Sequence, residues 1–279
     1  MRNRIFPSGV VVAWALLLAS GTAGCGSRPT ARVVGVSFRD IGLKSLTLLF
    51  DVEVENRYSV PLPLVNLDYS LASRGESFLS GDADIQGEVP ANGTKTVPLP
   101  AKVTFLELLK AVKGVRLGSV VPYEADLGLS VKAPLLGRLR LPLKKEGQMP
   151  VPTVPDVDVA EIKWDKLTLQ EASGTIKLQL VNRNQFPMDL SRIAYSLSLG
   201  DVEVARSSLA RGVSFAADGG AGDLEIPISL SAQQAGFGLL RMLTGSGSAY
   251  RFSGTIDVGT PFGPMSVPVE KVGKTLFRR

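Results

Sequence analysis

Apolar and polar side chains alternate over several long stretches of the chain. Between residues 46 and 54 every even position is apolar, and most odd positions are polar. The same period of two returns at 123–131, 176–180 and 250–258. Successive side chains of a β-strand point to opposite faces of the sheet. The pattern therefore predicts antiparallel strands with one buried and one exposed face.

One short helix is predicted in each half of the chain. Thr104 and Glu107 have the spacing of a capping box, and Gly114 can end the helix in the left-handed conformation. A similar segment begins at Ser231 and ends near Gly245. We expect both helices to pack against a β-rich domain. A membrane-active amphipathic helix is the alternative, which the few basic residues on the polar faces disfavour.

The chain contains an internal repeat. Seven of the sixteen residues from 56 to 71 are identical to those from 182 to 197, an offset of 126 without a gap. At the same offset Phe38 corresponds to Trp164, which suggests an aromatic core position. The sequence thus predicts a tandem duplication, with one domain at 31–147 and a second at 156–276. Three prolines in 148–155 predict an extended, semi-rigid linker between them.

The first 24 residues are typical of a signal peptide. Arg2 and Arg4 precede an apolar run of ten residues at 10–19, well short of the roughly 20 residues that a spanning helix needs. The following Ala23-Gly24-Cys25 resembles the lipobox of bacterial lipoproteins, although that pattern usually has leucine where Thr22 stands. We therefore expect lipidation of Cys25 and a short tether at 25–30, which would make the membrane a partner. Ordinary cleavage near Ala23 and an incidental cysteine are the alternatives.

Such a chain would face the periplasm in the cell envelope. Gly26 follows the cysteine, and by resemblance to lipoprotein sorting the absence of Asp there favours the outer membrane.

Composition removes several classes of function. The chain of 279 residues has no histidine and a single cysteine. Without histidine, Ser-His-Asp and Cys-His catalysis and histidine-ligated metals are excluded. One cysteine excludes intrachain disulfides and thiolate metal cages. We expect no catalytic residue, no metal site and no cofactor.

Two motif fragments do not change this expectation. Asp82 and Asp84 begin like a calcium-binding loop, but Gly93 stands where a bidentate glutamate is required. The run 273–275 resembles the end of a phosphate-binding loop, but Pro268 stands where its first glycine is needed.

The net charge gives no reason to expect a nucleic-acid partner. It falls from +5 to +3 when the two arginines of the signal peptide are removed, which is small for a chain of this length. The densest basic cluster, at 138–145, is expected to be a solvated strand edge. A weak interaction with anionic head groups is the alternative.

The turn after the first long strand links these features to a known family. Asn56 and Asn182 each end a predicted strand, and Pro61 and Pro187 follow five residues later. This order resembles the WHy (water stress and hypersensitive response) domain of the late embryogenesis abundant type 2 proteins, which often have Asn-Pro-Asn at this turn. Here the first Asn is present in both copies, whereas Arg57 and Arg183 replace the proline.

The resemblance implies two immunoglobulin- or fibronectin-like sandwiches, an association with desiccation, and no known catalytic centre. Independently of it, an Asn at a strand end can bond its own backbone two residues on, and a following Pro fixes φ. Asn56, Pro61, Asn182 and Pro187 are therefore expected to be structural, with a ligand contact as the alternative.

Two functions follow as hypotheses. The first is a monomeric, non-enzymatic, lipid-anchored protein that protects client proteins or membranes against stress. The second is a binding module that holds a lipid in a sandwich cavity or docks an envelope partner along a strand edge.

Overall fold

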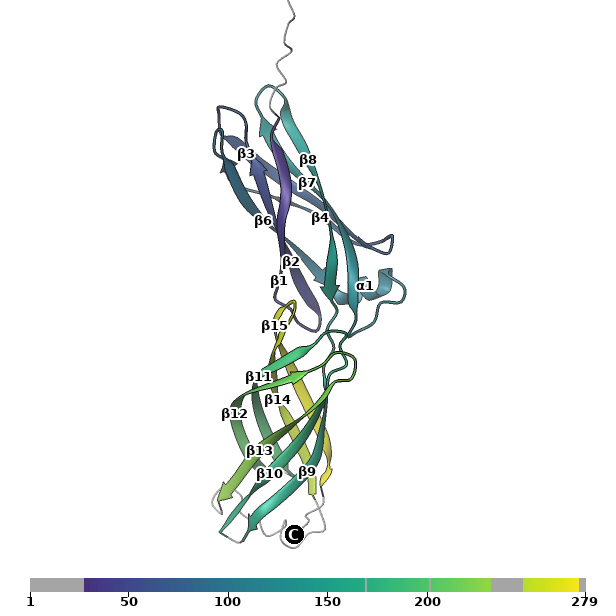
Figure 1. The fold of residues 1–279 in the computed structure, drawn as a ribbon, viewed down its shortest axis with the longest axis vertical. Coiled ribbons are helices and arrows are strands. Elements are labelled where there is room, and N and C mark those ends of the chain that lie inside the picture. The colour runs from purple at the N-terminus through teal and green to yellow at the C-terminus, as the bar shows by residue number, and fades with distance from the viewer. Residues whose placement is uncertain (1–27, 169, 201, 232–247, 276–279) are drawn as a thin grey trace, which may run out of the picture.

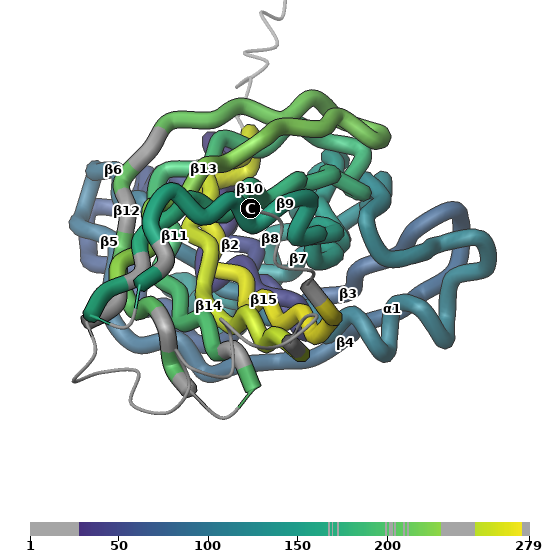
Figure 2. Tube along the Cα trace, turned by 90° about the horizontal axis from the view of Figure 1, so that it is seen from below, coloured from purple at the N-terminus to yellow at the C-terminus, as the bar shows by residue number. Residues whose placement is uncertain are grey.

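The computed structural model describes residues 28–168, 170–200, 202–231 and 248–275. They form two β-sandwiches arranged end to end along the long axis of the molecule (Figure 1). Viewed along that axis, domain 2 lies in front of domain 1, and helix α1 (Phe105–Ala111) lies at one side of domain 1 (Figure 2). The predicted all-β fold of two tandem sandwiches is confirmed.

Domain 1 contains two antiparallel sheets. The first has the order β1-β2-β6, and the second has the order β4-β3-β7-β8 with the short β5 beside β3. The strands are β1 (Thr30–Arg39), β2 (Ser45–Glu55), β3 (Leu62–Ser73), β4 (Glu76–Asp84), β5 (Glu88–Val89), β6 (Thr94–Thr104), β7 (Val120–Ala133) and β8 (Gly137–Pro150).

Domain 2 repeats this plan with the orders β13-β10-β9 and β12-β11-β14-β15. Its strands are β9 (Asp156–Leu167), β10 (Glu171–Val181), β11 (Met188–Leu199), β12 (Val202–Phe215), β13 (Ala221–Ser231), β14 (Ser248–Thr260) and β15 (Gly263–Thr275).

The two domains match in register as well as in strand order. Leu62 pairs with Val89 in domain 1, and Met188 pairs with Phe215 in domain 2, both at the offset of 126. One difference is that β4 and β5 are separate in domain 1, whereas β12 runs through both positions. The duplication seen in the sequence is therefore a duplication of the whole sandwich.

The alternating residues form the core, as predicted. Every even residue of β2 from Leu46 to Val54 is fully buried. On the facing sheet, the Tyr123 ring contacts Phe50 edge to face, with the ring centroids 6.3 Å apart. Burial of this alternating face supplies the main driving force for closing the sandwich.

Helix α1 begins where the capping box places it, but the capping hydrogen bonds are absent, so that part of the prediction is wrong. Thr104 is still the last residue of β6 and pairs with Ser45, and its side chain makes no cap bond. The Phe105 N–H donates to the Lys44 carbonyl instead, at 2.9 Å. A backbone hydrogen bond beside the β2–β6 ladder thus pairs the first N–H of the helix. Gly114 has a φ of 78°, as a left-handed stop requires.

Several expectations fall on parts of the chain that are not described. The signal peptide, Cys25 and the predicted helix after Ser231 lie outside the described residues. None of the described helices is both long and apolar enough to cross a bilayer. At the domain junction, β8 continues to Pro150, beyond the expected linker start at 148, and residues 151–155 connect it to β9.

Candidate functional site

The turn between β2 and β3 is built around the buried side chain of Asn56. Its Nδ2 donates to the carbonyls of Val60 at 2.9 Å, Pro90 at 2.9 Å and Val89 at 3.2 Å. Its Oδ1 accepts the N–H of Tyr58 at 3.0 Å, the predicted bond two residues on. One side chain therefore joins the β2–β3 turn to the turn that follows β5.

Asn182 holds the equivalent turn of domain 2. Its Nδ2 donates to the carbonyls of Phe186 at 2.8 Å and Ala216 at 3.0 Å, and its Oδ1 accepts the Asn184 N–H at 2.9 Å. Pro187 is exposed and directly precedes β11, as Pro61 directly precedes β3. Both asparagines thus use their amides on the backbone of their own domain.

Asn184, which the first copy replaces with Tyr58, adds a contact that reaches outside the turn. Its Oδ1 accepts the N–H of Thr153 at 2.8 Å, and its Nδ2 donates to the Thr153 carbonyl at 3.1 Å. The side chain is fully buried. Asn184 therefore fixes the segment that connects the two domains.

The same turn docks onto domain 1. The Gln185 N–H donates to the Gly118 carbonyl at 2.7 Å, and the Gln185 Oε1 accepts the Val120 N–H at 3.0 Å. Gly118 has a φ of 85°, and a Cβ atom there would lie 2.6 Å from the carbonyl oxygen of Arg183. The close approach of the two backbones therefore requires glycine at this position.

Three aromatic rings complete the junction. Phe262, in the β14–β15 turn, contacts Phe38 of domain 1 edge to face at 5.6 Å and Phe186 of domain 2 at 5.5 Å. Such pairs add roughly 0.5–1.5 kcal/mol each beyond the apolar area that they bury. The two sandwiches therefore meet through both hydrogen bonds and an apolar contact.

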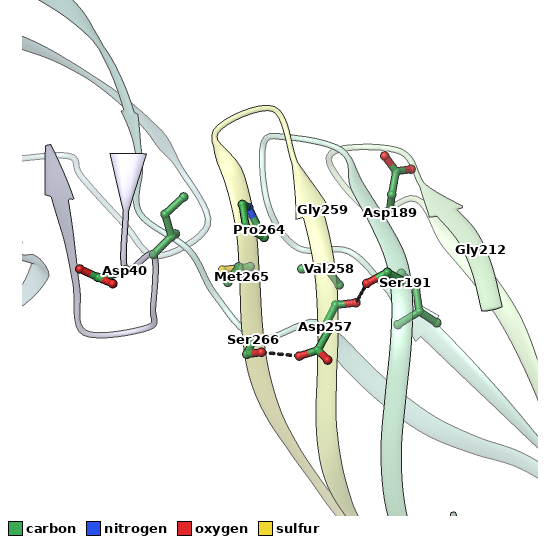
Figure 3. A pocket seen from close by; sticks show the side chains of 12 residues that line it. Asp40, Asp189, Ser191, Gly212, Asp257, Val258, Gly259, Pro264, Met265 and Ser266 are labelled. Atoms are coloured by element: carbon green, nitrogen blue, oxygen red, sulfur yellow. Dashed lines mark hydrogen bonds between the residues drawn. The ribbon is translucent and has the colours of Figure 1, made fainter. Parts of the chain in front are cut away.

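A hollow of about 850 Å³ opens beside this contact, between the β1–β2 turn and the strands β11, β14 and β15 (Figure 3). Asp40 and Ile41 line it from domain 1, while Asp189 and Asp257 line it on the domain 2 side. The hydroxyl of Ser266 donates to the Asp257 carboxylate, and that of Ser214 donates to Asp189 at 2.6 Å.

This hollow offers little for chemistry. Among the described residues, no three His, Cys, Asp or Glu side chains lie close enough to hold a metal ion. The chain has no histidine to act as a base for a serine nucleophile. The hollow is an open groove at the junction, in which apolar residues such as Ile41, Val258 and Met265 stand beside the carboxylates.

The basic cluster on β8 lies along a strand edge and is largely paired. Arg140 forms a salt bridge with Asp68, Lys144 lies 3.2 Å from Asp126, and Arg138 donates to Asn66 at 2.7 Å. The hydrogen bond from Arg140 lowers the pKa of Asp68 below its ordinary value. The cluster is thus exposed along an edge strand, as predicted, and Arg140 and Lys144 have acidic partners there.

The sequence predicts both Asn turns, but it does not predict the docking of domain 2 onto domain 1. The sequence feature that marks this docking is the polar pair Asn184-Gln185, which stands where the first copy has Tyr58-Ser59. A polar pair at positions where the other copy has different residues indicates a contact that only this copy makes. Its partners, Thr153 and Gly118, carry no comparable signal.

Comparison with known proteins agrees with this duplicated architecture. A family model described as "Late embryogenesis abundant protein" (LEA_2) matches residues 51–147 and again 177–273. The desiccation protectant protein Lea14 homolog of Glycine max is 33% identical over 130 residues, which cover 47% of this chain and 86% of that protein. The desiccation-related protein PCC27-45 of Craterostigma plantagineum is 33% identical over 131 residues, with the same shares of 47% and 86%.

Among solved structures, the solution structure of a late embryogenesis abundant (LEA) protein has 25% identity and a TM-score of 0.40, and covers 46% of this chain and 74% of that one. Each relative aligns over about the length of one of the two sandwiches. Since the family model matches twice and spans most of both domains, the chain belongs to the late embryogenesis abundant type 2 family and carries two copies of its domain in tandem.

Proposed function

We propose that this chain is a lipid-anchored, non-enzymatic protein of the bacterial cell envelope that protects proteins or membranes during desiccation. The observation that carries the proposal is the double match to a family whose relatives are named as desiccation protectants. The lipobox-like Ala23-Gly24-Cys25 in front of the first copy supports the anchor.

The described surface suits protection through many weak contacts. Salt bridges on both domains pair exposed acids with exposed bases, for example Lys144 with Asp126 and Lys177 with Asp223. Such exposed pairs contribute little to stability, at about 0–1 kcal/mol each. They instead give a mixed-charge surface that can replace hydration of a neighbouring protein as water is lost.

The proposed anchor would attach at the end of domain 1 that carries the start of β1. Thr30 begins that strand, and only four residues lie between it and Cys25. Domain 1 would then stand next to the bilayer, in the outer membrane and facing the periplasm, with domain 2 further out as a monomeric extension.

The second hypothesis, a lipid held in a cavity, would use the hollow at the junction. Its lining is mixed, because Ile41, Val258 and Met265 stand beside three carboxylates, and an acyl chain would have to displace the water on those carboxylates. Native mass spectrometry of the purified chain tests this directly, because a bound lipid at fixed stoichiometry would add its mass.

The experiment that tests the proposed function compares bacteria that produce the full chain with bacteria that produce the Cys25→Ser variant and with bacteria that lack the protein. The wild-type chain should remain in washed membranes, carry the added mass of a lipid, and raise survival after drying. The variant should lose the added mass and leave the membrane fraction. Equal survival of wild-type cells and cells without the protein would contradict the protective role.

A further inference from the structure

The turn between β7 and β8 exposes two leucines. Leu135 is 106% exposed and Leu136 is 56% exposed. Leu135 also has a φ of 62°, in the left-handed region that favours glycine or asparagine over a branched apolar residue. The turn thus presents an apolar tip where neither burial nor backbone conformation asks for one.

The second copy shows what this end of the domain does. The turn at the same place in domain 2, between Thr260 and Gly263, carries Phe262, and Phe262 packs against Phe38 of domain 1. Phe186 supports that contact, and its equivalent in domain 1 at the offset of 126 is Val60, which is 45% exposed. The repeat therefore places apolar side chains on the same end face twice. In domain 2 that face is docked, whereas in domain 1 no other described residue buries Leu135, Leu136 or Val60.

The free face lies at the end of the molecule where the chain enters domain 1 (Figure 1). β1 begins there at Thr30, and the β7–β8 turn lies at the same end. A chain reaches at most about 3.6 Å per residue, so Cys25 lies within roughly 18 Å of Thr30. A lipid on Cys25 would hold this face close to a membrane surface.

Basic residues flank the apolar tip. Lys132 and Arg138 are both exposed and directly opposed across the β7–β8 ladder. Like charges in that position destabilise a sheet, but they attract anionic lipid head groups. Leucines at a tip with basic residues behind them match the polarity profile of a bilayer interface.

From these observations we propose that the β7–β8 turn inserts Leu135 and Leu136 into the surface of the anchoring membrane, with Lys132 and Arg138 at the level of the head groups. The proposal rests on the proposed lipid anchor. It assigns domain 1 a fixed orientation, with its long axis away from the bilayer.

The test uses the full lipidated chain, purified from membranes and reconstituted in vesicles that contain anionic phospholipid. Cys25 is the only cysteine of the chain, and lipidation blocks it, so Leu135→Cys provides a single thiol for an environment-sensitive fluorophore. The control is Leu117→Cys, because Leu117 is 52% exposed and precedes β7 at the opposite end of the same domain.

The label at 135 should shift to shorter wavelength and lose most of its emission when nitroxide-labelled lipids are present, whereas the label at 117 should not change. Equal behaviour of the two labels in an anchored protein would overturn the inserted tip and leave the anchor intact. A shift at 135 without quenching, together with cross-links between chains, would assign the tip to a second copy and also overturn it. If Cys25 itself takes up label and the chain washes off the vesicles, the proposed anchoring fails, and the inserted tip fails with it.

Discussion

Two asparagines at equivalent positions organise the turns of the two domains. Each is buried, and each uses its amide to join two turns that lie far apart in the sequence. A buried donor without its acceptor, or the reverse, costs more than an ordinary hydrogen bond contributes. The stability of each domain should therefore depend on one side chain at this turn.

Asn56→Ala tests this dependence. The substitution leaves the carbonyls of Val60, Val89 and Pro90 without their common donor, so the free energy of unfolding should fall by about 1–3 kcal/mol. Urea unfolding followed by circular dichroism measures it. Ser59→Ala, at an exposed position of the same turn, should change little. Equal stability of the two variants would show that the amide bonds contribute nothing.

Buried tyrosines give the chain an alkaline limit. Burial raises the pKa of Tyr123 above its ordinary value of 10.0, because the charged phenolate loses hydration in the core. The neutral ring is thus favoured in the folded state. Its contribution to stability is complete below pH 10 and is lost as the pH rises toward the raised pKa. Tyr250 shows the same direction and cause.

The melting temperature should accordingly decline above about pH 10, where an unfolded tyrosine ionises. Tyr123→Phe should decline less steeply than the wild type, because it removes one ionising group. Tyr58→Phe, at a half-buried position in a turn, is the control. Parallel curves for wild type and Tyr123→Phe would rule out this group as a source of the alkaline limit.

At the scale of elements, the arrangement of the two domains depends on the contact between the β10–β11 turn and the segment before β7. Gly118 donates to the Val151 carbonyl at 2.6 Å, and Val151 donates back to Ser119 at 2.9 Å. Gln185 closes the other side of Gly118. The connecting segment is therefore packed between the domains, and Val151 is fully buried.

Gly118→Ala should separate the two domains. Its Cβ would contact the Arg183 carbonyl, and its φ of 85° adds strain. Gly75→Ala is a matched control, since Gly75 has a φ of 83° but open space around it. Small-angle scattering should show a broader range of shapes for Gly118→Ala, and proteolysis at 151–155 should be faster. The same behaviour in both variants would attribute the effect to strain alone.

Some features of these elements can be predicted from the sequence, and others cannot. Alternation predicts β2 and β7 because burial of one face is a local, periodic property. The offset of 126 predicts two copies of one domain, because a repeat can be recognised by comparing the sequence with itself. The prolines of 148–155 predict an extended backbone, but they cannot show that Val151 is buried, because burial there depends on Gly118 and Gln185 from distant segments.

The residues of the candidate site also divide into those that the sequence predicts and those that it does not. Asn56 and Asn182 stand at strand ends and could be located from the sequence. The hollow lined by Asp40 and Asp257 could not, because it exists only where the two domains meet. The side-chain bonds that the capping box predicts are not formed, because the carbonyl of Lys44, directly before β2, accepts the Phe105 N–H in their place.

At the scale of the whole molecule, two copies of one sandwich are stacked in the same orientation and locked at their junction. The end of domain 1 that we propose to face the membrane and the docked end of domain 2 are the same end of the repeated unit (Figure 1). A folded, stacked protein of this kind would hold a protective surface at a set distance from its anchor. This arrangement differs from protection by a disordered chain, which must order itself as it dries.

The central claim is that this folded surface protects other proteins from drying. The most direct measurement is the activity that lactate dehydrogenase recovers after it is dried and rehydrated with the purified protein. Recovery should rise with protein concentration and exceed that given by an equal mass of an unrelated β-sandwich. Recovery no greater than with the unrelated sandwich would contradict the claim.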